Sequence, residues 1–255
     1  MANKRNRILK IVEYLNKCGI TVNIAKNKAR GNKGFFRALN NQFRIDISKD
    51  IDDETIIKTL AHEFAHFIHF NYDKKLKSLD FIFDNDSNIL EELISATVYT
   101  IPKTSVEPFF RIKDNLKKEI SDIKNQLKNS SKDFQQIEKE IKNSTLKYLL
   151  KYDKVKILNG LKYNLYTIEE LGYDTDKELY IHLKSKQRAL KRINSKISKL
   201  NNYYNSPTEL FARSFELFVD NSDALKLKAP TIFNFYQEAI NTNKIPLLTE
   251  FTKLL

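Results

Sequence analysis

Cysteine is almost absent from this chain, and the residues that build turns are scarce. Its 255 residues include a single cysteine, Cys18, no tryptophan, and only five glycines and five prolines. A lone cysteine allows neither an internal disulfide nor a cysteine-based zinc site, so nothing in the sequence requires an oxidising compartment. The scarcity of glycine and proline favours helices over a turn-rich β fold.

Long apolar runs are also missing. No stretch of the sequence approaches the length of a transmembrane helix. The segment 4–7 is basic, like the start of a signal peptide, but polar residues interrupt the apolar segment that would have to follow: Lys10, Glu13, Asn16 and Lys17. We therefore expect a cytoplasmic protein without a signal peptide or a membrane span, a prediction that leaves delivery into another cell open.

Positive charge exceeds negative charge along the chain. Lysine and arginine total 44 against 32 aspartates and glutamates, which gives a net charge of +12. Such an excess attracts nucleic acid, anionic surfaces or acidic partners. The lysines are mixed with acids along helical segments, however, and this pattern is typical of solvated helix faces. Nucleic acid is therefore a possible partner that we do not favour.

The segment 59–69 carries the pattern H-E-x-x-H as His62-Glu63-Phe64-Ala65-His66, within an amphipathic helical stretch. Histidines four residues apart lie one turn apart on one side of a helix, so both imidazoles can reach one metal ion. Glu63 would project beside that ion, where it can accept a proton from an attacking water as the general base does in zinc hydrolases. The motif predicts a Zn²⁺ site with Glu63 as a catalytic residue. His69 is out of phase with the pair, and we expect it in the core or behind the ligands, with a role as a fourth ligand as the lesser alternative.

A catalytic zinc of this kind needs a third protein ligand and an open position for water. His182 lies within a predicted arm helix and cannot easily supply the ligand, so the candidates are glutamates on other helices: Glu91, Glu92 and Glu209. Glu209 equally fits a capping box at the start of a helix, with Ser206 as the N-cap. Spacing alone leaves these alternatives open.

Two motifs taken together resemble a known family. H-E-F-x-H is followed much later by segment 206–215, Ser-Pro-Thr-Glu-Leu-Phe-Ala-Arg-Ser-Phe. This pairing resembles the protease domain of anthrax lethal factor and the zincin-type metallopeptidase domains in large polyvalent proteins of phages and conjugative elements. The resemblance implies a gluzincin in which Glu209 is the third zinc ligand. It also implies that a tyrosine just before this glutamate, Tyr203 or Tyr204, assists catalysis.

A second alignment is with ImmA/IrrE-type metallopeptidases and thermolysin-like enzymes. In these enzymes the helix that bears the glutamate ligand follows H-E-x-x-H at a shorter distance along the sequence. In this chain that alignment makes Glu91 or Glu92 the third ligand, on a helix that ends near Pro102. The surrounding residues fit less well, because polar side chains stand where small and apolar ones are expected. We favour Glu209.

The spacing of apolar and polar residues in the rest of the chain predicts a mostly helical α+β protein. It favours a helix at 4–18, two or three strands within 20–47 that form a small antiparallel sheet, a helix at 89–100 and two short helices after Pro230. Asp52, Asp53 and Glu54 would cap the H-E-x-x-H helix and supply its acidic first turn. An edge strand of the sheet could hold an extended peptide beside the metal.

Two apolar runs with heptad-like spacing, within 112–141 and 179–200, predict an inserted coiled-coil-like arm of two antiparallel helices. Asn159-Gly160 between them predicts a hairpin. The chain would then consist of residues 1–104, the first part of a zincin-like domain; 105–201, the arm; and 202–255, the second part, which bears the third ligand. A partner protein could bind the arm.

These features together predict a zinc metalloendopeptidase that hydrolyses peptide bonds of a protein or peptide substrate, as a toxin, an effector or a mobile-element protease. The alternative is a non-catalytic zinc-containing interaction protein that uses the basic arm to bind a partner or nucleic acid. The intact Glu63 argues against the alternative, because a purely structural zinc site needs no general base.

Overall fold

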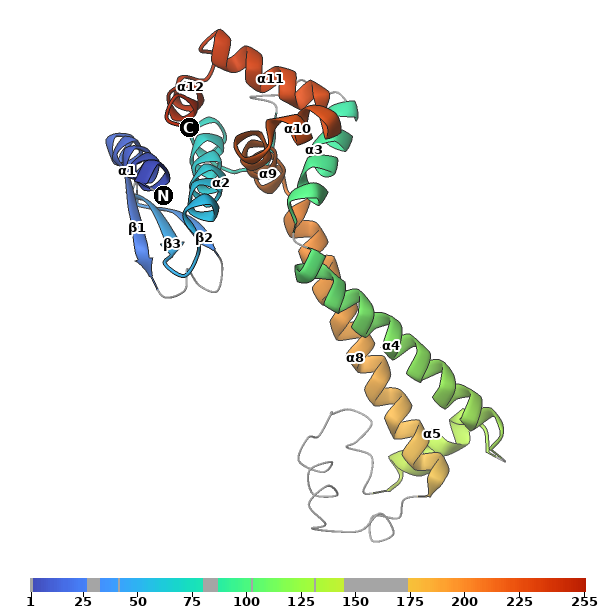
Figure 1. Cartoon of the computed structure of the whole chain (residues 1–255). Coiled ribbons are helices and arrows are strands. Elements are labelled where there is room, and N and C mark those ends of the chain that lie inside the picture. Colours follow the sequence, from blue (N-terminus) through green and yellow to red (C-terminus); the bar gives the residue numbers. More distant parts are fainter. Residues whose placement is uncertain are drawn as a thin grey trace. The chain divides into compact units, whose positions relative to one another are not determined.

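The computed structural model describes residues 2–26, 33–40, 42–79, 87–101, 103–130, 132–144 and 174–255. The chain divides into two units, one formed by Met1–Pro102 with Asn201–Leu255 and the other by Lys103–Leu200. The described residues are mostly helical, with one small sheet, so the α+β class is confirmed (Figure 1). None of the described helices is long and apolar enough to cross a membrane. The predicted hairpin at Asn159-Gly160 lies outside the described residues.

The sheet has three strands, β1 (Ile20–Lys26), β2 (Gly34–Leu39) and β3 (Gln42–Ser48), in the order β1-β3-β2. β2 and β3 are antiparallel, and Asn40 in the turn between them has a positive φ of 50°. β1 pairs with β3 in parallel, so the predicted all-antiparallel sheet is wrong and the sheet is mixed. The physical reason is that β3, whose Ile45 and Ile47 are fully buried, takes the centre and separates the two strands that precede it.

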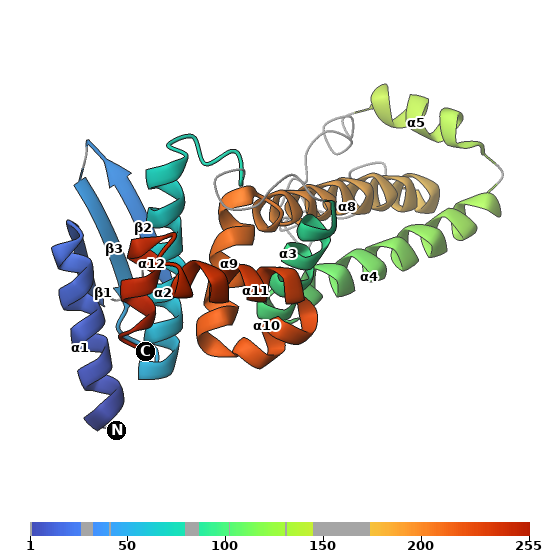
Figure 2. The same cartoon turned by 90° about the horizontal axis from the view of Figure 1, so that it is seen from above.

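Two helices, α1 (Ala2–Lys17) and α2 (Asp53–Tyr72), pack against the sheet and against each other (Figure 2). Their apolar stripes meet the strands in one core, whose fully buried members include Ile11, Leu15, Ile45, Leu60, Phe64 and Ile68. Asp52 caps α2 by accepting a 2.8 Å hydrogen bond from the Thr55 amide, and Asp53 and Glu54 occupy the first turn. The predicted cap is confirmed, and it fixes where the H-E-x-x-H helix begins.

The C-terminal helices cover the other side of α2. α9 (Pro207–Asp220) packs on α2 and on α3 (Ser87–Thr100), and α10 (Ser222–Lys228), α11 (Pro230–Asn241) and α12 (Pro246–Thr252) follow. The two helices predicted after Pro230 are confirmed, whereas α10 was not predicted. Phe215 anchors this group, with its ring 5.7 Å from Tyr236 and 5.8 Å from Phe251. α9 is thereby held along the length of α2.

The second unit is the arm, whose described helices are α4 (Lys103–Lys128), α5 (Phe134–Lys142) and most of α8 (Thr175–Tyr204). α4 and α8 are antiparallel: Glu119 pairs with Lys186 at 2.7 Å, and Ser130 donates a 2.5 Å hydrogen bond to Asp176. The first apolar run is divided after Lys128, because Asp133 caps a separate helix, α5. The seam between these helices buries Ile120, Leu127, Ile137, Ile141 and Leu183.

Candidate metal centre

His62, His66 and Glu209 come together from α2 and α9 and form a group that could hold a metal ion. The two Nε2 atoms of the histidines lie 3.2 Å apart. The Glu209 carboxylate reaches both, with Oε1 3.3 Å from His66 Nε2 and Oε2 3.6 Å from His62 Nε2. Ligand atoms about 2.1 Å from a tetrahedral ion lie about 3.4 Å from one another. The three separations therefore fit a common ion without rearrangement of the chain.

The Glu209 side chain faces the histidines and does not take part in the capping box that the sequence also allows. α9 begins at Pro207 as that pattern predicts, but the Ser206 side chain makes no capping hydrogen bond and donates to the Tyr203 carbonyl at 2.8 Å. Glu209 is only 2% exposed, and its Oε2 atom has no hydrogen-bond partner among the described residues. A buried carboxylate oxygen without a donor is costly, and a bound cation would satisfy it.

The other nitrogen of each histidine ring is held by a side chain of α9. His62 Nδ1 lies 3.0 Å from Glu216 Oε2, and His66 Nδ1 lies 2.7 Å from Thr208 Oγ1. Because a carboxylate only accepts, the hydrogen of this contact lies on His62 Nδ1, which leaves Nε2 as the ring atom on the side of Glu209. Metal-binding histidines are commonly oriented in this way by a second hydrogen bond. Neither Glu216 nor Thr208 was predicted from the sequence to take part in the site.

Arg213 links Glu209 and Glu216 of α9. Its Nη1 atom donates to Glu216 Oε2 at 3.0 Å, and its Nε atom lies 3.6 Å from Glu209 Oε2. Residues 209, 213 and 216 recur at helical spacing, so their side chains share one face. That spacing was the signal by which the sequence could have linked Glu216 and Arg213 to the site.

The electrostatic environment keeps the carboxylates of this group charged. Burial opposes ionisation of Glu209, but the hydrogen bond from His66 and the charges of both histidines outweigh it and lower its pKa to about 2. Burial likewise opposes ionisation of Glu216, yet the His62 hydrogen bond and the charges of His62 and Arg213 bring its pKa below the usual range. An ionised Glu209 is the form that binds a cation.

Glu63 lies on the same helix as the histidines, 6% exposed, where the start of β2 passes close by. A Cβ atom added to Gly34 would lie 2.9 Å from Glu63 Oε1, 3.1 Å from Glu63 Cγ and 2.3 Å from Thr59 Cγ2. A methyl group does not fit there. Glycine at position 34 therefore lets the backbone of an edge strand lie directly against the predicted general base.

The two candidate tyrosines occupy different surroundings. Tyr203 is 49% exposed, yet its pKa is raised, first by partial desolvation, then by the negative charge of Glu209 and a hydrogen bond with it; Glu63 adds to the effect. The Tyr204 ring instead lies 5.8 Å from the Arg213 guanidinium carbon and packs edge-on against Tyr203 at 5.2 Å. Tyr203 is thus the tyrosine whose hydroxyl neighbours the metal group.

The rival ligands lie elsewhere. The Glu92 carboxylate accepts three hydrogen bonds at the start of α11, from Thr231 N and Oγ1 at 2.8 Å each and from Ile232 N at 3.1 Å. Glu91 is exposed on α3, and His182 is exposed in the arm. His69 is fully buried, with its Nε2 2.8 Å from the Ser78 carbonyl, and burial lowers its pKa. These four residues are not part of the metal group found in the described chain.

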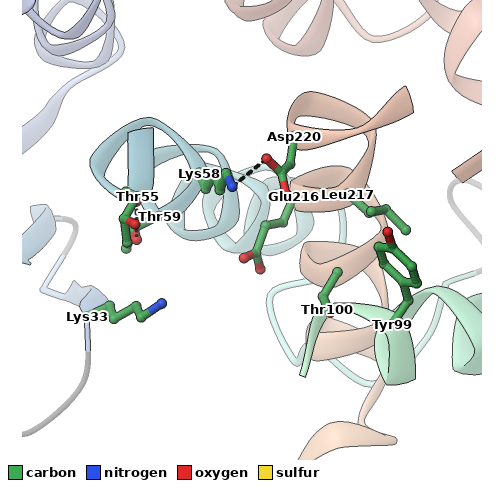
Figure 3. Close-up of a pocket in the computed structure, with 9 residues that line it drawn as sticks. All are labelled: Lys33, Thr55, Lys58, Thr59, Tyr99, Thr100, Glu216, Leu217 and Asp220. Carbon is green, nitrogen blue, oxygen red and sulfur yellow. Dashed lines mark hydrogen bonds and ion pairs between the residues drawn. The ribbon is translucent and has the colours of Figure 1, made fainter. Parts of the chain in front are cut away.

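A cavity of about 190 Å³ adjoins the group (Figure 3). α2 contributes Thr59 to its lining, one turn before His62, and α9 contributes Glu216, the residue that binds His62. The cavity therefore shares its wall with the candidate metal centre.

Comparison of the chain with protein-family models, with curated proteins and with solved structures finds no match. The resemblance to lethal-factor-like proteases rests on its two motifs alone and stays a prediction.

Proposed function

We propose that this protein is a zinc-dependent endopeptidase. The observation that carries the proposal is the placement of Glu63 next to the His62, His66 and Glu209 group, in which the potential ligand atoms lie 3.2–3.6 Å apart. Two imidazoles and one carboxylate are the donor set of gluzincin zinc sites, and tetrahedral spacing suits zinc better than the oxygen-rich octahedral sites of magnesium or calcium. A zinc site with a purely structural role would need no general base.

Zinc bound there would polarise the peptide carbonyl and lower the pKa of a water molecule towards about 7. Glu63 accepts the proton of the attacking water and then passes it to the departing amine. Tyr203 keeps its proton at neutral pH, because its pKa is raised, and so its hydroxyl can donate a hydrogen bond to the oxyanion. A single donor of this kind contributes roughly 3–4 kcal/mol of transition-state stabilisation in other hydrolases.

The outer edge of β2 gives further support to the proposal that the substrate is a peptide. The Ser48 amide donates to the Lys33 carbonyl at 2.9 Å, so residues 33, 35, 37 and 39 direct their main-chain groups towards β3. Gly34, Phe36 and Ala38 then direct theirs away from β3, and no strand of the described chain pairs with this edge. An extended peptide added along this edge would pass Glu63, because Gly34 touches it.

The proposal is tested by zinc content and by peptide cleavage, measured on folded variants. We expect wild type to bind about one zinc per chain, and His66→Ala and Glu209→Gln to lose it. Glu91→Ala and His69→Ala are the matched controls, and both should retain zinc. Glu63→Gln should also retain zinc but should not cleave a peptide library. A wild-type protein that folds without binding added zinc would overturn the proposal, and so would undiminished cleavage by Glu63→Gln.

A second candidate function is polyanion binding by the arm, which the distribution of charge favours. Lys103–Leu200 contains 23 lysines and arginines against 13 aspartates and glutamates, so this unit carries ten of the chain's twelve net positive charges. If it binds nucleic acid, retention on DNA should fall steeply with salt and should survive removal of zinc. Elution of the full chain from DNA at low salt would argue against this candidate.

A further inference from the structure

The cavity beside the metal group is the feature of the first unit that the proposed chemistry leaves unused. It lies between α2, α3 and α9, and its volume of about 190 Å³ is below the ~300–1,000 Å³ of typical small-molecule sites. A space of this size suits one amino-acid side chain. Because Thr59 and Glu216 line it and also adjoin Glu63 and His62, a side chain entering it would belong to a residue close to the bond being cleaved.

The two carboxylates that line the cavity already have cationic partners. Glu216 Oε2 accepts from Arg213 and from His62, each at 3.0 Å. Asp220 binds the Lys58 ammonium at 2.5 Å (Figure 3). Neither acid is therefore left as an isolated negative charge that would favour a lysine or an arginine of a substrate.

The threonine hydroxyls of the lining donate to acceptors of the protein itself. Thr55 donates to Asp52 Oδ2 at 2.7 Å, Thr59 to the Thr55 carbonyl at 2.7 Å, and Thr100 to the Thr97 carbonyl at 2.9 Å. These hydroxyls can still accept hydrogen bonds from a ligand, but their own hydrogens are already donated to acceptors within the protein.

Lys33 is the exception among the charged lining residues. It is exposed, and its positive charge acts on Glu216 from a distance, without an ion pair to a carboxylate of the described chain. Figure 3 shows its side chain extending towards the Glu216 side of the cavity. It immediately precedes Gly34, whose backbone touches Glu63, so the main chain fixes its position relative to the general base. Lys58 on the same wall is itself paired, with Asp220 at 2.5 Å and with Glu54 at 3.4 Å, so Lys33 is the cation of the described lining that is left for a ligand.

We propose that this cavity receives an acidic side chain, aspartate or glutamate, of the substrate residue next to the cleaved bond, and that Lys33 pairs with its carboxylate. This inference rests on the proposed peptidase function and names the substrate class of the same site. Tyr99, which is half exposed, lines the cavity from α3 beside Thr100 and offers part of its ring as an apolar surface to the ligand.

The test uses zinc-loaded full-length protein and peptides that differ at one position beside the cleaved bond, which carries Glu, Gln or Lys; the residue is varied on each side of the bond in turn. Wild type should cleave the Glu peptide with a kcat/KM about fivefold above that of the Gln peptide, the size expected of one partly exposed ion pair. Lys33→Met should remove this preference, and Lys33→Glu should shift it to the Lys peptide. Lys49→Met, an exposed lysine outside the cavity, is the control and should behave as wild type.

Binding gives a second readout that does not depend on turnover. Zinc-loaded Glu63→Gln should bind the Glu peptide more tightly than the Gln peptide in calorimetry, and the difference should vanish when Lys33→Met is added. Equal cleavage of the Glu and Gln peptides, or a preference that survives Lys33→Met, overturns the inference and leaves the peptidase proposal standing. If no peptide is cleaved or bound by the zinc-loaded protein, the proposed function fails and the inference fails with it.

Discussion

Replacement of Gly34 by alanine tests the contact between β2 and the H-E-x-x-H helix. The added Cβ atom would lie 2.3 Å from the Thr59 methyl carbon and 2.9 Å from Glu63 Oε1, well inside ordinary van der Waals separations. Thr59 cannot rotate its methyl group away cheaply, because its hydroxyl is held by the Thr55 carbonyl at 2.7 Å and β-branched side chains are stiff in helices. The strand or Glu63 must therefore move.

We expect Gly34→Ala to lower the free energy of unfolding by about 1–3 kcal/mol, the usual effect of overpacking. The backbone conformation adds nothing to this, because no positive φ is found at Gly34. Peptide cleavage should fall more steeply, since a displacement of about 1 Å in a reacting group can reduce a rate about 100-fold. Zinc content should not change, because the three ligands are not among the atoms that the new methyl group meets.

Urea denaturation, monitored by circular dichroism, measures the change in the free energy of unfolding. Thr59→Ser removes the closest clashing carbon, so the Gly34→Ala/Thr59→Ser double variant should recover part of the lost stability relative to Thr59→Ser alone. Its cleavage rate should remain low, because the contact with Glu63 persists. A Gly34→Ala protein within about 0.5 kcal/mol of wild type and fully active would refute the close approach of β2 to Glu63.

Three further predictions concern other contacts of the chain. Thr208→Val, which removes the hydroxyl that holds His66, should weaken zinc binding about 10- to 100-fold in a competitive chelator titration; unchanged affinity would contradict the role given to Thr208. Glu92→Ala should keep its zinc but lose about 1 kcal/mol of stability in urea, because α11 loses its cap; loss of zinc would revive the rival ligand. Hydrogen bonds from Lys142 and Tyr180 lower the pKa of Glu138 to about 2, so its stabilising effect is complete above about pH 4.5 and is lost as the pH falls towards 2. The midpoint temperature of thermal unfolding of the arm should therefore fall less between pH 5 and pH 3 in Glu138→Gln than in wild type. An equal fall in both proteins would exclude this contribution of Glu138.

The local part of the site could be predicted because a helix fixes its own geometry. Spacing of four residues puts His62 and His66 on one side of α2, and their Nε2 atoms do lie 3.2 Å apart. The cap at Asp52 and the two tail helices are equally local features, and they too were predicted. Such patterns need no knowledge of which segments pack together.

The order of the strands could not be obtained in this way. Alternation of Phe43, Ile45 and Ile47 identifies β3 as a strand, but the same pattern would suit an edge or a central position. Which neighbour β3 pairs with depends on the crossing of the chain from β1 to β2, a tertiary feature. The expected antiparallel sheet followed from sequence adjacency, which holds for β2 and β3 but not for β1.

The residues behind the ligands were missed for a related reason. Glu216 and Thr208 acquire their roles only when α9 lies along α2, at a separation of more than 140 residues from the histidines that they bind. The spacing of seven between Glu209 and Glu216 was available in the sequence, but it is equally common on solvated helix faces. The spacing of Glu209 and Glu216 becomes informative only once α9 is known to pack on α2.

The contrast between Glu92 and Glu209 gives a general argument for choosing among candidate ligands. Glu92 has a complete set of donors at the start of α11, so a cation there would have to displace hydrogen bonds that the fold already uses. Glu209 is buried, and its Oε2 atom lacks a hydrogen-bond partner in the described chain, although it is surrounded by groups that keep it ionised. A fold tolerates such an atom when something outside the polypeptide satisfies it. The Nε2 atoms of His62 and His66 lie 3.6 and 3.3 Å from the same carboxylate, so a metal ion that takes nitrogen and oxygen ligands together could satisfy this atom.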